Sequence, residues 1–268
     1  METGARNQES KGKLMTEVLW QHLTAAELRE RAGRGAIVLL PVASTEQHGP
    51  HLATGVDDVL CSEVCRRAAL KLAGQGVPVV VAPTIGVGLA EHHMAFGGSL
   101  TLTFPTYHAL LRDICGSILR AGFGKILIVN GHGGNMSALN ALTVDLTREL
   151  KAPIATTTYF LLANEAFAEI LEDQHSVLHA CEAETSMMMA VRSDLVVEAE
   201  LPNALGPQAS EASSVLSPPL HRWRSFQEFA PTGVIGDARR SSADKGERLL
   251  EATSSALAEQ LARGSPWN

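Results

Sequence analysis

The stretch KILIVNGHGGN, residues 125–135, joins an apolar run to a glycine-rich turn. The run at 125–130 is short and β-branched, which indicates a buried strand. Three similar runs occur at 36–42, 78–83 and 153–160. Stretches with helical periodicity precede, separate and follow them, at 16–33, 57–73, 106–121, 136–150 and about 242–263. This alternation predicts an α/β fold: a three-layer α/β/α sandwich with a mostly parallel sheet.

The chain is expected to form one domain over residues 15–268, after a disordered N-terminal tail at residues 1–14. Thr24, with Glu27 three residues later, predicts a capping box at the start of a helix. Residues 202–222 are rich in Pro, Ser and Ala and are interpreted as a surface loop rather than a linker. The chain shows no internal repeat.

Composition excludes several classes of protein. Of the 268 residues, 45% are hydrophobic and 19% charged, which allows a large core. The net charge of −7 argues against nucleic acid or an anionic membrane as the main partner, because both need a basic face. No apolar run approaches the roughly 20 residues that span a bilayer, and the polar N-terminus does not resemble a signal peptide. We therefore expect a cytoplasmic protein whose four cysteines are packed, reduced thiols.

Acids and imidazoles follow the predicted strands. They are Glu46, His48 and Asp57 after the run at 36–42, Glu91 and His92 after 78–83, and His132 after 125–130. In a parallel α/β sheet, ligands bind outside the carboxyl ends of the strands. The sequence therefore predicts that these side chains gather at one edge of the sheet, where the glycines let the backbone come close.

Glu46, His48 and Asp57 form a candidate metal site. Glu46 and His48 point to the same side if their segment is extended, and Asp57 at the next helix start can return to them. One carboxylate can bridge two metals about 3.5–4 Å apart. A mixed imidazole and carboxylate set suits zinc, manganese or iron. The alternative is a polar loop in which Asp57 only caps a helix.

His132 also admits more than one interpretation. It can be a metal-binding or catalytic residue, or a hydrogen-bonded core histidine. The glycines at 131, 133 and 134 do not form a Gly-x-Gly-x-x-Gly motif, and no acidic residue ends a following strand, which disfavours nucleotide binding.

The segment 179–186, HACEAETS, carries a histidine and two acids before a Met-rich run. His179 and Glu182 are neighbours if the segment is helical, and Glu184 lies two residues further on. The alternative is an acidic first turn of a helix that faces water. The methionines at 187–189 are interpreted as core.

Taken together, these segments resemble the creatininase (creatinine amidohydrolase) family. The matching pieces are PVASTEQHGPHL at 41–52 with Asp57, Glu91-His92 with FGGS at 96–99, NGHGGN at 130–135, HACEAETS at 179–186 and TGVIGD at 232–237. They follow the family's order from about residue 36 to 250, which is most of the chain.

The resemblance implies two divalent metal ions per subunit, zinc, manganese or iron. Glu46, Asp57 and His132 would hold one ion, and His48 with the bridging Asp57 the other. Creatininase itself has a further glutamate two residues after the strand-end histidine, where this chain has Gly134. We expect Glu184 to replace it, with Glu182 as the alternative.

The resemblance also assigns the remaining roles. His179 matches the family's proposed proton-transfer histidine. Substrate contacts are expected from Glu91, His92, Gly133, Gly134 and Glu182. His51 and His93 stay open between orienting the ligands, touching substrate and neither. Creatininase places tryptophans over its substrate between the strand near 155 and the later histidine, whereas the tryptophans here are Trp20, Trp223 and Trp267.

The implied activity is hydrolysis of a carbon–nitrogen bond, other than a peptide bond, in a small open-chain or cyclic amide. Water activated by two cations would attack the amide carbon, and His179 would pass a proton to the leaving nitrogen. Two alternatives stay open: a peptidase or deformylase of cofactor biosynthesis on the same scaffold, and a non-catalytic, metal-dependent binder of a small ligand. The resemblance also implies a homo-oligomer, such as the hexamer found among creatininase relatives.

Overall fold

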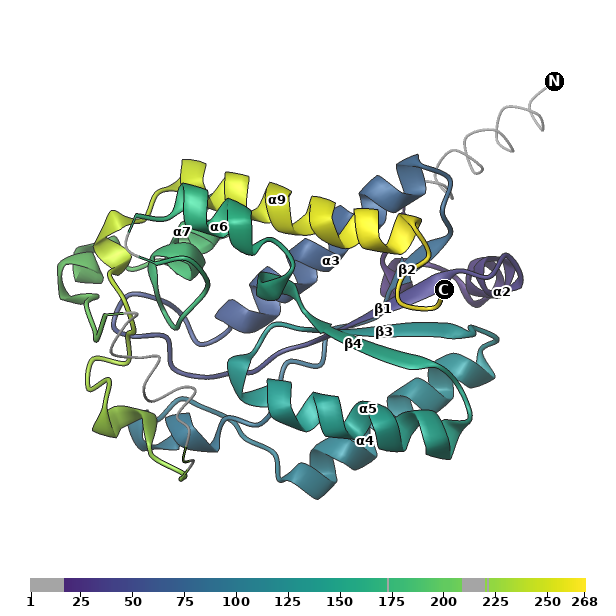
Figure 1. Cartoon of the computed structure of the whole chain (residues 1–268), viewed down its shortest axis with the longest axis horizontal. Helices are drawn as coiled ribbons and strands as arrows, with labels where there is room; N and C mark the ends of the chain where they lie inside the picture. The colour runs from purple at the N-terminus through teal and green to yellow at the C-terminus, as the bar shows by residue number, and fades with distance from the viewer. Residues whose placement is uncertain (1–16, 173, 209–219, 221) are drawn as a thin grey trace.

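A four-stranded sheet forms the centre of the protein (Figure 1). The computed structural model describes residues 17–172, 174–208, 220 and 222–268. The strands are β1 (Ile37–Val42), β2 (Val79–Val81), β3 (Lys125–Asn130) and β4 (Ile154–Thr158). They lie in the order β2-β1-β3-β4 and every pairing is parallel, with Val38 opposite both Val80 and Ile126. The parallel α/β sheet expected from the alternating pattern is confirmed.

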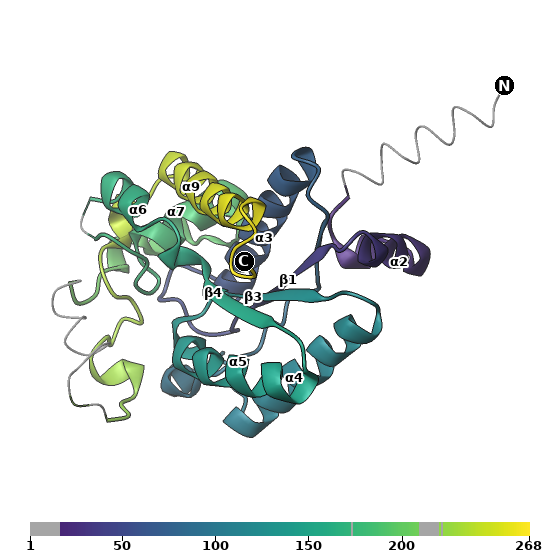
Figure 2. The ribbon, with the colours of Figure 1, turned by 45° about the vertical axis from the view of Figure 1, so that its right-hand side comes forward.

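Helices cover both faces of this sheet, which gives the three layers (Figures 1 and 2). One layer contains α3 (Val56–Gly74), α6 (Asn164–Ile170), α7 (Glu182–Val191) and α9 (Ala243–Ala262). The other contains α4 (Phe104–Arg120) and α5 (Met136–Leu150), and α2 (Ala25–Gly33) lies near the β2 end of the sheet. None of the helices in the described ranges is long and apolar enough to cross a bilayer.

The two helical layers explain why the strands are apolar throughout. Successive side chains of a strand point to opposite faces. Leu39 and Leu127 pack with the helices on the α3 side, whereas Leu40 and Ile128 pack with α4 and α5 on the other. A strand covered on both faces reads as a continuous apolar run rather than an alternating one. The methionines at 187–188 are buried in the core, and all four cysteines are free and buried.

The start of the chain differs from the prediction. No continuous helix spans 16–33: Val18 instead hydrogen-bonds to Val81 beside β2, and α2 begins only at Ala25. The capping box of Thr24 and Glu27 is present, and a cap at Thr24 itself requires the helix to begin after it. The predicted tail at 1–14 and most of the predicted loop at 202–222 lie outside the described residues.

The carboxyl ends of the strands come close to the start of α3. A Cβ atom on Gly131 would lie 2.7 Å from Cβ of Cys61 and 3.0 Å from the carbonyl oxygen of Asp57. Only glycine permits this approach. The turn after β3 therefore brings His132 against the first turn of α3, where Asp57 is found.

Candidate metal centre

Five buried residues from four segments converge beyond the carboxyl ends of β1 and β3. They are Glu46 and His48 after β1, Asp57 in the first turn of α3, His132 after β3 and Glu184 in the first turn of α7. The candidate ligand atoms of Glu46, Asp57 and His132 lie within 4.8 Å of one another, as do those of His48, Asp57 and Glu184. The two groups share Asp57, whose two oxygens face different histidines.

Asp57 contacts both histidines at short range. Its Oδ1 lies 3.2 Å from Nε2 of His48, and its Oδ2 lies 3.1 Å from Nδ1 of His132. Nδ1 of His132 is also 3.1 Å from Oε2 of Glu46. One imidazole nitrogen thus faces oxygens of two carboxylates.

Hydrogen bonds to the backbone fix which ring nitrogen of each histidine faces the acids. His48 lies with Nδ1 3.1 Å from the carbonyl oxygen of Glu46, and His132 with Nε2 3.1 Å from that of Leu89. A carbonyl only accepts, so the ring nitrogen that contacts it carries the proton. In the neutral ring, the other nitrogen presents a lone pair towards the centre, as in metal-binding histidines whose second nitrogen is held by a carbonyl.

The polar atoms at the centre lack partners. Within the described ranges, both side-chain oxygens of Glu46, Nε2 of His48 and Oδ2 of Asp57 are buried without a hydrogen bond. Buried, unpaired polar atoms are costly. A positive charge among these lone pairs, either a proton or a cation, would satisfy them, so the donor set fits a metal site.

The pKa values show the same demand for positive charge. Burial opposes protonation of His48, yet Asp57 raises the pKa of His48 to about 9. Burial likewise opposes ionisation of Asp57, but His132 and His48 hold the pKa of Asp57 below its ordinary range. Burial raises the pKa of Glu184 to about 7. Asp57 and Glu184 are therefore stabilised as carboxylates when cationic charge accompanies them.

His179 lies beside this centre but is held differently. Its Nδ1 is 3.7 Å from Oε1 of Glu46, and together with Glu46 and His48 it forms a third group of possible ligands. Its Nε2 lies 2.9 Å from both the backbone oxygen and the side-chain nitrogen of Gln47. One neighbour accepts and the other donates, so Nε2 is satisfied with or without a proton.

The backbone at His179 is unusual. Ala180 has a φ of 49°, a left-handed conformation that residues with a side chain rarely adopt. This turn connects His179 to the start of α7, where Glu184 lies one helical turn further on. Burial lowers the pKa of His179 well below its ordinary value, and His48 lowers it further, so the ring is neutral near pH 7.

The two glutamates of α7 have different surroundings. Glu184 faces His48 and Asp57. Glu182 is buried elsewhere: Nζ of Lys245 lies 2.5 Å from its Oε1, and the backbone nitrogen of Glu172 donates to it. The structure thus brings Glu184, and not Glu182, to the group of possible metal ligands.

The expected substrate contacts divide in the same way. His92, Gly133 and Gly134 line the cavity at this centre, whereas Glu91 is exposed and Glu182 is buried outside the lining. Any Cβ on Gly134 would contact Nε2 of His132 and would lie 2.6 Å from the carbonyl oxygen of Leu89. Position 134 therefore has no room for the glutamate that creatininase itself carries there.

The two histidines left open by the sequence are both buried near the centre. His93 has Nε2 3.3 Å from Oε1 of Glu46, and its Nδ1 lies 3.0 Å from the side-chain nitrogen of Gln47. Because that nitrogen donates to Nδ1, Nε2 of His93 carries the proton of the neutral ring, but its contact with Glu46 does not have the geometry of a hydrogen bond. His51 contacts the hydroxyl of Thr185 at 2.7 Å, on the α7 side.

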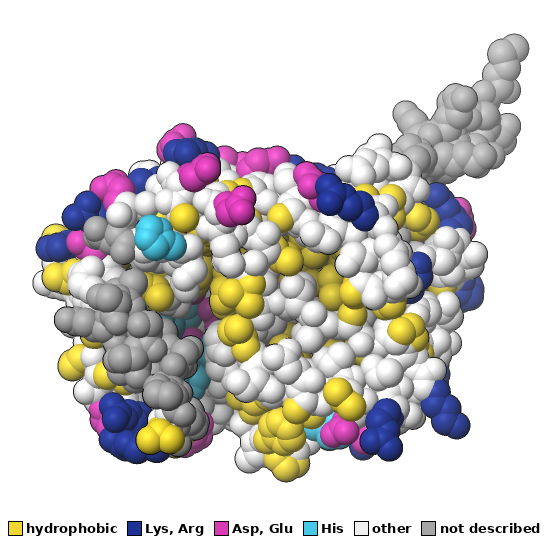
Figure 3. All heavy atoms as spheres, viewed as in Figure 1, with side chains coloured by type: hydrophobic (Ala, Val, Ile, Leu, Met, Phe, Trp, Pro, Cys, Tyr) yellow, Lys and Arg dark blue, Asp and Glu magenta, His cyan; other side chains and the backbone are white. Residues whose placement is uncertain are grey.

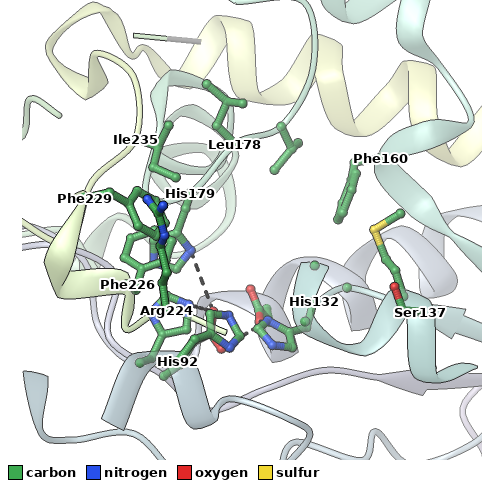
Figure 4. Close-up of a pocket in the computed structure, with 18 of the residues that line it drawn as sticks. His92, His132, Ser137, Phe160, Leu178, His179, Arg224, Phe226, Phe229 and Ile235 are labelled. Atoms are coloured by element: carbon green, nitrogen blue, oxygen red, sulfur yellow. Dashed lines mark ion pairs between the residues drawn. The ribbon is translucent and has the colours of Figure 1, made fainter. Parts of the chain in front are cut away.

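The cavity at this centre has a volume of about 470 Å³. Buried residues such as Glu46 and Asp57 line its inner end, and the exposed residues Arg222, Trp223 and Arg224 line its outer wall. Figure 3 shows histidine and acidic side chains deep in a hollow on one face. In Figure 4, Phe226, Phe229 and Arg224 lie on the same side as His179, with Phe160 and Ser137 across from them. Sequence reasoning did not identify this outer wall. Trp223 also lines the cavity, although it comes from a different part of the chain than the tryptophans of creatininase.

Comparisons with known proteins identify the family of this chain. The family model for creatininase, described as creatinine amidohydrolase, matches residues 21–261. The mycofactocin precursor peptide peptidase of Mycobacterium ulcerans (strain Agy99) is 28% identical over 233 residues, which cover 85% of this chain and 86% of that protein. A 3-dehydro-scyllo-inosose hydrolase of Thermotoga maritima is 27% identical over 256 residues, which cover 88% of this chain and 80% of that protein.

Solved creatininase structures share the fold. A Mn creatininase superposes with a TM-score of 0.80 at 23% identity, and a mutant of the Zn-Zn type with a TM-score of 0.78 at 24% identity. Each comparison covers 93% of this chain and 99% of the other. With a family model that spans most of its length, this chain belongs to the creatininase family of hydrolases.

Proposed function

We propose that the protein is a metal-dependent hydrolase that cleaves a carbon–nitrogen bond of an amide. The single observation that carries this proposal is the set of buried lone pairs on Glu46, His48 and Asp57 that no described donor satisfies. Such a set is costly in a folded protein unless a proton or a cation joins it, and its mixed imidazole and carboxylate donors suit a divalent cation.

The residues fit two cations that share one carboxylate. Glu46, Asp57 and His132 would hold one, and His48, Asp57 and Glu184 the other. Mixed imidazole and carboxylate ligands suit zinc, manganese or iron, and the Mn and Zn-Zn forms of solved creatininases support this choice. When bound, two such ions supply Lewis acidity that activates water and stabilises negative charge on the substrate.

His179 is the proposed proton-transfer residue. The neutral ring can take up a proton at Nδ1, which faces the centre, and then pass it to the leaving nitrogen. Gln47 supports either state, because its backbone oxygen accepts from Nε2 and its side chain can donate to it. His48 and His132, held only by a carbonyl at the second nitrogen, lack this freedom.

The bond cleaved is proposed to lie in a small amide. A peptidase is the second candidate, and two observations favour it: the similarity to mycofactocin precursor peptide peptidases and a cavity of about 470 Å³, which exceeds what a small cyclic amide needs.

The test is a screen of cyclic amides, formamides and short peptides with protein loaded with Mn²⁺ or Zn²⁺. We expect about two cations per chain by elemental analysis, loss of turnover after chelation and recovery when metal is restored. Cleavage of peptides but not of small amides would select the peptidase. Undiminished turnover by rigorously metal-free protein would contradict the proposal.

A further inference from the structure

The outer wall of the cavity carries two arginines that no part of the proposed reaction uses. Arg222, Trp223 and Arg224, with Phe226 and Phe229, form this wall. Arg222 and Arg224 are two positions apart in an irregular segment, and both line the cavity. They are the sole Lys or Arg side chains among the described residues of the lining.

Neither arginine has a protein partner among the described residues. In the described part of the chain, neither guanidinium forms an ion pair or hydrogen bond, although other arginines do, such as Arg67 with Glu247 at 2.9 Å. Each guanidinium presents five donors whose planar geometry matches a carboxylate. Two guanidiniums that line one cavity, and for which the described residues supply no partner, therefore form a site for an anionic group.

The cavity is electrically asymmetric along its depth. Its inner end contains the carboxylates of Glu46, Asp57 and Glu184, all buried, and its outer wall contains the two exposed arginines. Apolar side chains contribute to the lining as well: Phe160, Leu178, Trp223, Phe226, Phe229 and Ile235. In Figure 4, Arg224 and Phe226 both lie on the same side of the cavity as His179.

We propose that the substrate is an amide with an apolar body and a carboxylate, and that Arg222 and Arg224 bind the carboxylate while the amide reaches the metal centre. This inference rests on the proposed function, because it places the scissile bond at that centre. The opposite orientation is disfavoured because it would leave both arginines without a counter-ion among the substrate and the described residues. N-acyl derivatives of amino acids have this combination of groups.

The test measures binding and does not depend on turnover. Metal-loaded full-length protein is titrated by calorimetry with N-acetyl-L-phenylalanine and with its neutral carboxamide, N-acetyl-L-phenylalaninamide. We expect the acid to bind about 10- to 100-fold more tightly, as two charge-assisted contacts allow. The R222Q/R224Q double variant should lose this preference, with little change for the carboxamide.

Arg29→Gln is the matched control, because Arg29 is exposed on α2 and does not line the cavity. This variant should keep the preference for the acid. A higher salt concentration should weaken binding of the acid but not of the carboxamide. Equal binding of the two ligands, or a preference that survives in R222Q/R224Q because the acid binds the metals directly, would overturn the inference. Hydrolysis of uncharged amides without that preference would leave the proposed function standing, and the preference without any hydrolysis would leave the inference standing.

Discussion

At the inner end of the cavity the polar side chains are buried and come from strand ends or helix starts, whereas at the outer wall Arg222, Trp223 and Arg224 come from an irregular segment and are exposed. Inside, backbone carbonyls fix the ring nitrogens of His48 and His132. Outside, no hydrogen bond from a described residue holds the side chain of either arginine. The sheet therefore positions the buried cluster, whereas the arginines of the outer wall depend on a segment without regular secondary structure.

Replacing Asp57 should cause the largest loss of metal binding and activity, because its carboxylate belongs to both groups of possible ligands. Asp57→Asn keeps the shape but removes the charge. We expect the metal content to fall below one ion per chain and kcat/KM to fall by about 1000-fold or more, given that metal chemistry contributes several kcal/mol. Elemental analysis and steady-state kinetics measure both.

Asp58→Asn is the matched control, since Asp58 lies beside Asp57 in the same first turn but in neither group. It should retain two ions and near-normal activity. Equal losses in both variants would show that the effect comes from the helix start and not from metal binding.

His179→Gln should separate proton transfer from metal binding. If His179 moves a proton, kcat should fall by about 100-fold or more while the metal content stays unchanged. Exposed His175, four residues earlier, provides the control variant His175→Gln, which should retain kcat. Loss of one cation in His179→Gln would instead identify His179 as a ligand and remove its proposed role.

Glu184 and Glu182 allow a comparison within one helix. Glu184→Gln should weaken binding of the cation held by His48 and Asp57 by about 100-fold, while the cation at Glu46 and His132 stays bound. Glu182→Gln should keep both cations but lower the free energy of unfolding by about 1–3 kcal/mol, because it weakens a buried contact with Lys245. Metal titrations and thermal melts of both variants test this. Reversed results would exchange the roles of the two residues.

The effect of pH on metal affinity should be smaller than the effects of these substitutions, but measurable. A proton must leave Glu184 before a cation binds there, and its pKa is raised to about 7. This residue alone should make affinity rise about tenfold between pH 6 and 8, and His48, with a pKa raised to about 9, steepens the rise.

The raised pKa of Glu184 also makes the free energy of unfolding depend on pH. Because the folded-state pKa of Glu184 is raised above the ordinary 4.5, its contribution to folding is fully present below that value and is lost as pH rises through about 7. Thermal melts from pH 5 to 8 without added metal should show this loss, and Mn²⁺ should reverse it. A stability profile identical in Glu184→Gln would contradict the assignment.

Much of the inner end could be predicted from the sequence, because residues that follow parallel strands gather at one edge of the sheet. Glu46, His48, Asp57 and His132 each follow a strand or begin the next helix, and strand ends meet at one edge. The resemblance favoured Glu184 over Glu182, but spacing alone did not separate them. Their separation needs the orientation of α7, which depends on the turn at Ala180 and on Lys245 of α9.

The outer wall could not be predicted for a related reason. Arg222 and Trp223 lie at the end of or just beyond the stretch interpreted as a surface loop, far along the chain from the metal-binding motifs, and no periodicity indicates where such a segment packs. The expected contact by Glu91 shows the same limit, because its side chain is exposed while its neighbours His92 and His93 line the cavity.

Anomalous diffraction from crystals of the protein loaded with Mn²⁺ tests the central claim most directly. Two manganese peaks are expected in each chain, one among Glu46, Asp57 and His132 and one among His48, Asp57 and Glu184. Occupied peaks only at other residues, or none at this cluster at saturating Mn²⁺ and pH 8, would contradict it.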